Sequence, residues 1–369
     1  MIKIFKKKIV FKPYKKVDLV ILDSNCSNLN FDFLKFKTIN STEINCYHLM
    51  ISFLKFIFSF DRKKKLSDFY FIEIIKNLNP KIGLGCEVDY KIFKFIKYFP
   101  KKISILYQFT FYNFKYKKIT QKNILNNLET KKVKCNYFFI WNKKFKNYFD
   151  YFDTKFIVNG STRNNEVETK PFKKKYDIMF VSEFRKPVKS YYGTNNHYLS
   201  MKLNDASSSY ILKILEKLRL SNKRKICVAL TSHRKDKINK ISRVEENKFI
   251  KRDLKKYYTE DSNSYNIAEK SKIIISLHST LGPELLARGH KVLILNPDHF
   301  FFNADFLKIY KYPFINISHE ESNIIKNIEK LISLNDTKWK KILNIKNFPI
   351  PFNKNNQILK TTLKDILKK

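Results

Sequence analysis

The segment 271–296 carries the residue types and the spacing that could do chemistry. Its sequence, SKIIISLHSTLGPELLARGHKVLILN, predicts a buried strand, a tight turn, a short helix and a second buried strand. The turn would place the hydroxyls of Ser279 and Thr280 beside backbone N–H groups at the start of the helix, where a helix favours anions. In open α/β sheets, ligands bind at such strand ends. The segment therefore predicts an anion site.

Several residues of the short helix are typical of helix termini, and some of them could also contact a ligand. With Thr280 as N-cap, Pro283 falls in the first turn, where its missing N–H costs little. Gly282 would let a ligand approach the backbone closely, and the carboxylate of Glu284 could accept hydrogen bonds from a ribose diol. Gly289 would end the helix in left-handed geometry. A plain βαβ unit with a capped helix is the alternative interpretation.

Further groups near this turn could assist a reaction. His278 precedes the turn and could donate a hydrogen bond to a leaving phosphate, or it could simply be packed. Arg234 and Lys235 follow another predicted strand and could neutralise leaving-group charge, or could belong to a solvated basic loop. Glu183 also ends a predicted strand and could contact a ligand, although a capping or surface role is the simpler interpretation.

A carboxylate near a ligand site could also act as a general base that takes a proton from a substrate hydroxyl. The segment 83–89, GLGCEVD, offers two carboxylates after two glycines that would loosen a strand end. We favour Asp89 over Glu87, while noting that both could instead cap the following helix. Asp23 and His48 are weaker candidates.

Strands and helices alternate along both halves of the chain, as in βαβ units with mainly parallel sheets. The predicted strands are 17–23, 80–84, 103–109, 135–141, 156–159, 177–182, 225–230, 272–277, 291–295 and 313–317. The predicted helices are 43–60, 66–77, 90–98, 143–149, 207–220, 263–269, 281–288, 323–334 and 357–367, with a weak pairing near Tyr257–Tyr258.

A polar segment, 161–175, contains Pro171 and lacks periodicity, which is typical of a linker. The sequence thus predicts an α/β protein with two Rossmann-like domains facing a cleft. The N-terminal domain would span 1–166 and the C-terminal domain 167–369.

The chain of 369 residues has a net charge of +41, which would attract nucleotides, anionic lipids or polyanionic glycans. The charge is spread evenly, with 33 Lys+Arg and 13 Asp+Glu in residues 1–166 against 41 and 20 in the rest. This even spread argues against a dedicated nucleic-acid module, and the Lys/Asn/Ile/Phe-rich composition is also typical of A/T-rich coding. A basic nucleic-acid-binding protein stays the alternative of a different class.

Cysteine usage and hydropathy predict a cytoplasmic protein. The five cysteines form no C-x-x-C and indicate reduced thiols, and the first ten residues lack the apolar core of a secretory signal. The most apolar stretch, Leu49–Phe60, is interrupted by Lys55 and is too short to span a bilayer. We expect a buried helix there, with an interfacial contact at the inner face of a membrane as the alternative.

The segment SLHSTLGPELLARGHKVLILN resembles the nucleotide-sugar-binding unit of GT-B glycosyltransferases. The resemblance is strongest to the bacterial surface-carbohydrate branch (O-antigen and capsule), where the pattern S-T-L-G-x-E-x-L-x-R-G-x-K-V recurs. The matching positions are Ser279, Thr280, Leu281, Gly282, Glu284, Arg288, Gly289, Lys291 and Val292. Weaker similarity covers 135–142 and 160–165.

The resemblance implies a glycosyltransferase that binds a nucleotide sugar in the C-terminal domain and a glycan or lipid-linked glycan acceptor in the N-terminal one. It implies no cofactor and no obligatory metal, which agrees with the lack of a D-x-D motif. The residues expected to bind the donor are His278, Ser279, Thr280, Leu281, Gly282, Glu284, Arg234 and Arg288. Ser276 stands where many retaining members carry a second glutamate, so inversion is favoured.

Three alternatives remain at this point. A nucleotide-sugar epimerase or a glycerophosphotransferase would keep the fold and change the reaction. A catalytically inactive protein of the same fold would also fit, because the base is not fixed by the sequence.

Overall fold

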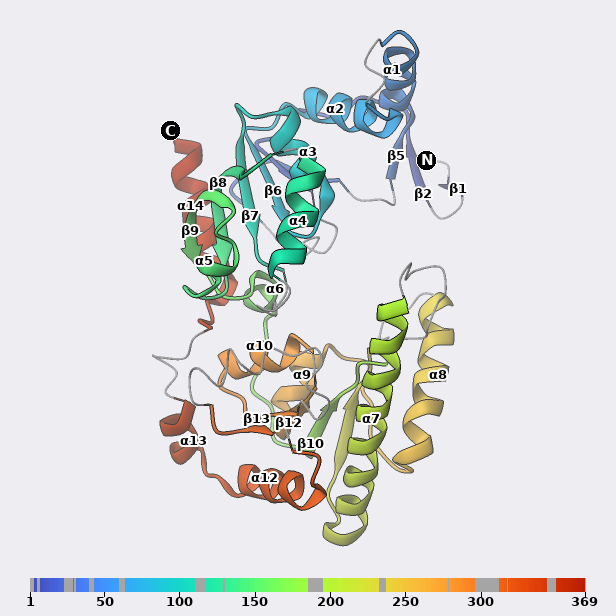
Figure 1. Cartoon of the computed structure of the whole chain (residues 1–369), viewed down its shortest axis with the longest axis vertical. Coiled ribbons are helices and arrows are strands. Elements are labelled where there is room, and N and C mark those ends of the chain that lie inside the picture. Colours follow the sequence, from blue (N-terminus) through green and yellow to red (C-terminus); the bar gives the residue numbers. More distant parts are fainter. Residues whose placement is uncertain are drawn as a thin grey trace. The chain divides into compact units, whose positions relative to one another are not determined.

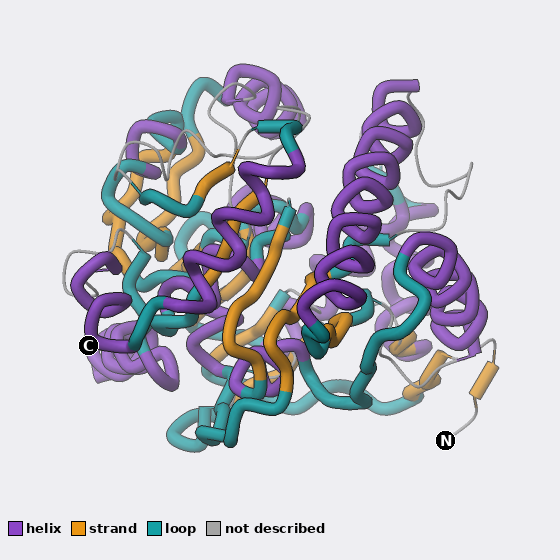
Figure 2. The backbone as a smooth tube through the Cα atoms, turned by 90° about the horizontal axis from the view of Figure 1, so that it is seen from below, coloured by secondary structure: helices purple, strands orange, loops and turns teal. Residues whose placement is uncertain are grey.

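The computed structural model describes residues 3–4, 7–22, 29, 31–39, 43–59, 64–109, 117–128, 130–184, 195–231, 237–277, 279–295, 312–316, 318–343 and 350–368. These residues form two compact units (Figure 1). The first unit combines Met1–Thr110 and Phe114–Glu166 with the C-terminal segment Asn353–Lys369, and Val167–Phe352 form the body of the second. Figure 2 distinguishes the helices, strands and loops of both units.

The first unit is built on a parallel sheet with strand order β4-β3-β6-β7-β8-β9. The strands are β3 (Leu19–Ile21), β4 (Phe36–Thr38), β6 (Ile82–Cys86), β7 (Ile103–Tyr107), β8 (Val133–Ile140) and β9 (Phe152–Val158). Register is fixed by pairs such as Leu19 with Ile82 and Ile82 with Ile103. Every residue of β3 and β6 is buried, as expected for continuous apolar runs in a sheet covered on both faces.

A second, small sheet joins β1 (Lys3–Ile4), β2 (Lys7–Val10) and β5 (Glu43–Asn45). Strand β5 takes the first residues of the helix that was predicted to start at Glu43, and the helix begins at Cys46 instead. The remaining elements of this unit are α1 (Cys46–Ile57), α2 (Leu66–Leu78), α3 (Tyr90–Tyr98), α4 (Lys117–Leu128), α5 (Phe145–Tyr148), α6 (Thr162–Glu166), η4 (Lys354–Asn356) and α14 (Gln357–Lys368).

Two glycines in β6 determine how closely α3 packs on the sheet. A Cβ at Gly83 would lie 2.5 Å from the ring of Phe95, and a Cβ at Gly85 would lie 2.8 Å from Cβ of Ile92. The prediction that these glycines loosen a strand end was therefore wrong. Both glycines lie inside the strand, where the side chains of α3 leave no space for a Cβ atom.

A buried cluster of asparagines holds the C-terminal segment on the first unit. The Oδ1 of Asn356 accepts hydrogen bonds from Asn159 (3.0 Å) and Asn165 (2.9 Å), and its Nδ2 donates to the carbonyl of Thr162 (2.8 Å). The side chain of Asn353 donates to Asn159 Oδ1 at 2.7 Å. The sequence-based division assigned everything after 166 to the second domain. These bonds explain why residues from Asn353 onward pack with the first unit instead.

The second unit has a parallel sheet with strand order β11-β10-β12-β13-β14. Its strands are β10 (Tyr176–Val181), β11 (Ile226–Ala229), β12 (Ser271–Ser276), β13 (Val292–Leu295) and β14 (Ile315–Asn316). An isolated bridge between Cys227 and Tyr258 extends the β11 edge, where the weak pairing was predicted. The predicted α/β class, with parallel sheets in two Rossmann-like units, is confirmed.

The helices of the second unit are α7 (Asn195–Asn222), α8 (Lys237–Asp253), α9 (Ser264–Glu269), α10 (Leu281–Ala287), α12 (Glu321–Ser333) and α13 (Asp336–Leu343). Helices α7 and α8 pack side by side (Figure 1). Helix α8 falls in the region that was expected to be a basic loop. Its residues are strongly polar, so hydrophobic periodicity gave little signal for a helix there.

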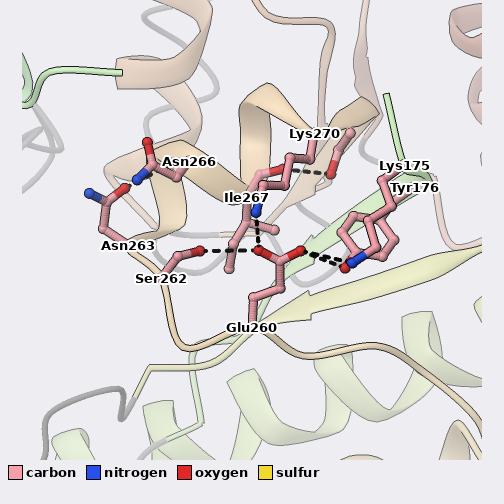
Figure 3. A network of polar contacts seen from close by, with 9 residues as sticks. Lys175, Tyr176, Glu260, Ser262, Asn263, Asn266, Ile267 and Lys270 are labelled. Atoms are coloured by element: carbon pink, nitrogen blue, oxygen red, sulfur yellow. Dashed lines mark hydrogen bonds and ion pairs between the residues drawn. The ribbon is translucent and has the colours of Figure 1, made fainter. Parts of the chain in front are cut away.

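One carboxylate joins the starts of the two central strands β10 and β12 (Figure 3). Glu260 Oε1 accepts a hydrogen bond from the hydroxyl of Tyr176 at 2.6 Å, and Oε2 forms an ion pair with Lys270. Lys175 and Ser262 lie at the edge of the same cluster, 3.5 and 3.4 Å from the carboxylate oxygens. Burial alone would raise the pKa of Glu260, but the bonds from Lys270 and Tyr176 outweigh it and lower this pKa to about 2.

We predict that Glu260→Gln lowers the free energy of unfolding of the second unit by about 1.5–3 kcal/mol at neutral pH. Folding lowers the pKa of this carboxyl from 4.5 to about 2. Its stabilisation is therefore complete above about pH 4.5 and is lost as the pH falls toward about 2. The difference between variant and wild type should thus shrink in acid, as measured by urea unfolding followed through the fluorescence of Trp339.

Asp261→Asn provides the matched control, because the side chain of Asp261 is 76% exposed and its ion pair with Arg243 lies at the surface. Exposed pairs contribute little, so this variant should unfold like the wild type. An equal loss in both variants, or a Glu260→Gln effect that does not change with pH, would contradict the role assigned to Glu260.

Candidate functional site

The βαβ unit predicted from the sequence is present in the second unit. Strand β12 ends at Ser276, helix α10 begins at Leu281, and β13 pairs in parallel with β12 through Ile274 and Val292. Thr280 is the N-cap residue, although its side chain makes no capping bond. Gly289 follows the helix with a φ of 91°, the left-handed geometry that glycine adopts without strain.

The turn before α10 holds a carboxylate from the chain itself. The backbone N–H of Ser279 donates to Oε1 of Glu183 at 2.6 Å, so an acidic side chain lies at the predicted anion site. The next amides are also engaged within the turn: Leu281 N–H donates to Ser279 Oγ (3.3 Å) and Gly282 N–H to the carbonyl of Ser279 (3.2 Å). The simpler interpretation of Glu183, as a capping residue, describes its contact here. The turn therefore receives a negative charge, as the N-terminus of a helix favours.

A second carboxylate lies at the same edge of the sheet. Glu246 of α8 is fully buried, and its Oε1 accepts from Ser182 Oγ (2.5 Å) and from Thr231 N–H (2.9 Å). Ser182 and Thr231 follow strands β10 and β11, whose carboxyl ends meet here because the strands are parallel. Sequence analysis missed Glu246, because α8 was not predicted and this residue therefore had no assigned position.

Glu284 lies inside the protein rather than at a surface. Its side chain is fully buried, and its Oε2 accepts a hydrogen bond from the hydroxyl of Tyr265 at 2.7 Å. The phenol of Tyr265, from α9, therefore supplies the kind of O–H donor that a ribose was expected to supply. No signal in the sequence singled out Tyr265.

Arg288 contacts residues at both ends of the second unit. Its guanidinium donates to the carbonyl of Val167 at 2.5 Å and to Thr169 Oγ1 at 3.2 Å. It also lies over the rings of Tyr265 and Phe352, with 4.9 and 4.4 Å to their centroids. Arg288 therefore connects the end of α10 to the first and last residues of the second unit. A planar guanidinium suits this position because it stacks on rings and donates several hydrogen bonds in fixed directions.

Gly282 faces the sheet. A Cβ built on it would lie 2.9 Å from Ser276 Oγ and 2.9 Å from Ile294 Cδ1. The Oγ of Ser276 is buried and has no hydrogen-bond partner among the described residues. The close approach that requires glycine at this position is therefore that of helix α10 to strands β12 and β13. Ligand approach was the reason expected from the sequence.

Three of the candidate bases, Asp89, Glu87 and His48, are described and lie in the first unit, where the two carboxylates accept hydrogen bonds from backbone N–H groups. Asp89 is the N-cap residue of α3, with Oδ1 accepting from the N–H of Lys91 at 2.8 Å. Glu87 is 1% exposed, and its two carboxylate oxygens accept from the N–H of Phe109 at 3.0 and 2.8 Å. His48 is buried, which lowers its pKa despite the opposing charge of Glu73.

Four sequence-predicted residues, Asp23, Arg234, Lys235 and His278, lie outside the described residues. Within the described ranges, no group of three or more His, Cys, Asp or Glu side chains could hold a metal ion. Metal independence and the lack of a cofactor stay predictions. Among the helices that the structure describes, none is long and apolar enough to cross a bilayer.

A family model described as "putative O-antigen biosynthesis protein" matches residues 117–366. This match covers more than half of the 369 residues, so the chain belongs to that family. It includes every strand of the second sheet and the whole βαβ unit around Ser279. A search of curated proteins gave no match.

Solved structures share the fold over nearly the whole chain. A Listeria monocytogenes protein described as a "putative UDP-N-acetylglucosamine 2-epimerase" has 11% identity and a TM-score of 0.58, covering 98% of this chain and 97% of its own. The UDP-GlcNAc 2-epimerase of Neisseria meningitidis, bound to UDP-GlcNAc, has 12% identity and a TM-score of 0.54, covering 94% and 99%. The UDP-GlcNAc 2-epimerase of Methanocaldococcus jannaschii, in complex with UDP-GlcNAc and UDP, has 10% identity and a TM-score of 0.51, covering 94% of this chain and 99% of its own. At such identities the likeness shows the fold.

We predict that Gly282→Ala destabilises the second unit by about 1–3 kcal/mol, because the added methyl group must displace Ser276 or Ile294. Ile294→Val removes the Cδ1 atom that this methyl group would meet. It should cost about 0.5–1.5 kcal/mol in the wild type and clearly less in the Gly282→Ala background. Chemical unfolding of the four proteins in this double-mutant cycle measures the coupling. If the two losses in unfolding free energy were strictly additive, α10 would be able to shift freely. The close approach to Ile294 would then not explain why position 282 is a glycine.

Proposed function

We propose that this member of the O-antigen biosynthesis family is a glycosyltransferase that uses a nucleotide sugar as donor. Its acceptor would be a glycan or a lipid-linked glycan. The observation that carries the proposal is the family match over residues 117–366, which contains the complete candidate donor site. Assembly of a surface polysaccharide requires glycosidic bonds made from activated sugars, so a transferase is the activity that this assignment favours.

The donor site of the proposal is the turn before α10, with Ser279, Thr280, Leu281 and Gly282 around the pyrophosphate. The bond from Ser279 N–H to the Glu183 carboxylate supports it, because this turn already receives an anion. The pyrophosphate would replace that carboxylate. Arg234 and His278 are proposed to add positive charge and hydrogen bonds to the same group.

The two remaining donor-site residues are proposed to act differently. Glu284 would accept from the ribose hydroxyls once the phenol of Tyr265 gives up its 2.7 Å bond to the carboxylate. Arg288 would keep α10 attached to Val167 and so hold the turn in position. In this proposal the ribose and Tyr265 are alternative donors to one carboxylate.

The acceptor base is proposed to be Asp89. Asp89 is partly exposed as the N-cap of α3, whereas Glu87 is 1% exposed and has both oxygens on the amide of Phe109. A base must reach the acceptor hydroxyl, which favours the exposed carboxylate. The transfer would invert the anomeric centre and would need neither a metal ion nor a cofactor.

A second candidate, a nucleotide-sugar epimerase, is favoured by one specific observation. Three structures that cover almost the whole chain at TM-scores of 0.51–0.58 are described as UDP-GlcNAc 2-epimerases, one of them as "putative". The same turn would then hold the nucleotide, and no acceptor would be needed.

We predict that the protein binds UDP, or another nucleoside diphosphate of a donor panel, and that Glu183→Ala raises this affinity. In the unliganded protein the Glu183 carboxylate occupies the Ser279 N–H, which the nucleotide phosphate would need. Removing this competitor should lower the Kd for the nucleotide about three- to tenfold. Titration calorimetry measures both proteins. Glu329→Gln serves as the control, because Glu329 pairs with Arg224 elsewhere in this unit and should leave Kd unchanged.

Weaker binding in Glu183→Ala would mean that Glu183 contacts the ligand instead of competing with it. Failure of the wild type to bind any of UDP, CMP, GDP and dTDP sugars, tested by thermal shift, would reject the donor site altogether. Incubation with the nucleotide sugar alone separates the two activities. Conversion of the sugar without an acceptor, observed by NMR, would assign the epimerase and contradict the transferase.

A further inference from the structure

Helix α1 of the first unit exposes its apolar side chains. Met50, Phe53, Leu54 and Ile57 lie on one face at helical spacing, and each is between 49% and 66% exposed. The exposed apolar residues of the helix and its C-cap, which we call the α1 patch, are Tyr47, Met50, Phe53, Leu54, Phe56, Ile57 and Phe58. The expectation of a buried helix at 49–60 was therefore wrong. Water is an unfavourable neighbour for a contiguous surface of this kind.

The inward face of α1 is polar, which reverses the usual pattern of a surface helix. His48 and Ser52, four residues apart, are both buried, and Ser52 Oγ donates to the carbonyl of His48 at 2.5 Å. Asn45, the buried N-cap residue, accepts from the N–H of His48 and donates to the carbonyl of Lys12. The helix thus buries two polar side chains, His48 and Ser52, and exposes most of its apolar ones.

The sequence on both sides of α1 is basic. The helix itself contains no acidic residue, and its one charged side chain, Lys55, forms an ion pair with Glu73 of α2. Exposed lysines occur before and after it along the chain, at Lys12, Lys15, Lys16 and Lys65. Residues 1–65 contain fourteen lysines and arginines against five acidic residues, and the sequence after the helix reads Arg-Lys-Lys-Lys.

We propose that the α1 patch is a docking surface for an anionic lipid bilayer, into whose interface α1 lies with its apolar face down. An amphipathic helix binds a membrane when apolar burial and attraction of cations to anionic headgroups act together. Both are present here: large aromatic and aliphatic side chains on one face, and lysines on the adjoining segments. Phe11, 61% exposed and adjacent to Lys12, adds a further apolar side chain close to the start of α1.

Charge favours a bilayer over a second copy of the chain as the occupant. Two copies pairing through this surface would bring two strongly basic segments together, which like-charge repulsion opposes. An anionic bilayer neutralises the same charges. The proposal does not depend on the enzymatic activity, although a surface-bound enzyme would meet a lipid-linked acceptor directly.

The test uses the full chain and vesicle co-sedimentation, with vesicles of phosphatidylcholine alone or with about one third phosphatidylglycerol. The wild type should bind the anionic vesicles and should bind less in high salt. The triple variant Phe53→Gln, Leu54→Gln, Ile57→Gln should bind at least about tenfold more weakly. The matched control changes three exposed apolar residues of the second unit, Leu220→Gln, Val244→Gln and Ile342→Gln, and should bind like the wild type.

Equal binding by the triple variant and the wild type would overturn the proposal, as would absence of wild-type binding to anionic vesicles. Sedimentation velocity tests whether a second copy of the chain covers the patch instead. A dimeric wild type and a monomeric triple variant, without vesicle binding, would assign the patch to a second copy. A Phe53→Trp reporter guards against misfolding of the triple variant. Its fluorescence should shift to the blue and be quenched by brominated lipid, whereas Leu220→Trp should show neither change.

Discussion

The close packing of α10 on strands β12 and β13 is the constraint on which the rest of the second unit depends. It is possible only because position 282 has no side chain: a Cβ there would meet Ser276 and Ile294 at 2.9 Å. With the helix at this depth, the turn before it presents the Ser279 amide to Glu183, and the first helical turn buries Glu284 against Tyr265. The end of the helix then delivers Arg288 to Val167 and Phe352. The absence of a side chain at position 282 therefore permits the helix position from which three hydrogen bonds and one cation–π contact are made.

Those contacts place negative charge at the edge where an anion was expected. Glu183, Glu246 and Glu284 all lie near the carboxyl ends of the parallel strands, in a chain whose net charge is +41. Each accepts at least one hydrogen bond from the protein, so each carboxylate satisfies a donor that would otherwise need another partner. In the proposed donor site, an anionic ligand would take over the Ser279 amide from the Glu183 carboxylate. The affinity of such a site depends on how much more strongly the Ser279 amide binds the ligand than it binds the Glu183 carboxylate.

The sequence predicts well what short-range patterns determine. Helix α3 spans Tyr90–Tyr98 as predicted, because its apolar spacing and the acidic cap Asp89 agree. The βαβ unit was also predicted, since apolar strands and the stop at Gly289 are local signals. What failed depends on partners far along the chain. The attachment of Asn356 to Asn159 and Asn165 joins residues almost two hundred positions apart, and neither its polarity nor its spacing indicates that bond.

Helices α1 and α3 show why a periodic pattern alone does not tell which face of a helix is inside. Both have apolar residues at helical spacing. In α3 these residues, Ile92, Phe93 and Phe95, are buried, and Ile92 and Phe95 lie against the glycines of β6. In α1 the buried side chains are His48 and Ser52, and the apolar face is left outside. Periodicity measures the separation of two faces and carries no information about what each face meets. That information lies in the neighbouring elements, and for the outer face of α1 the neighbour that we propose is an anionic bilayer.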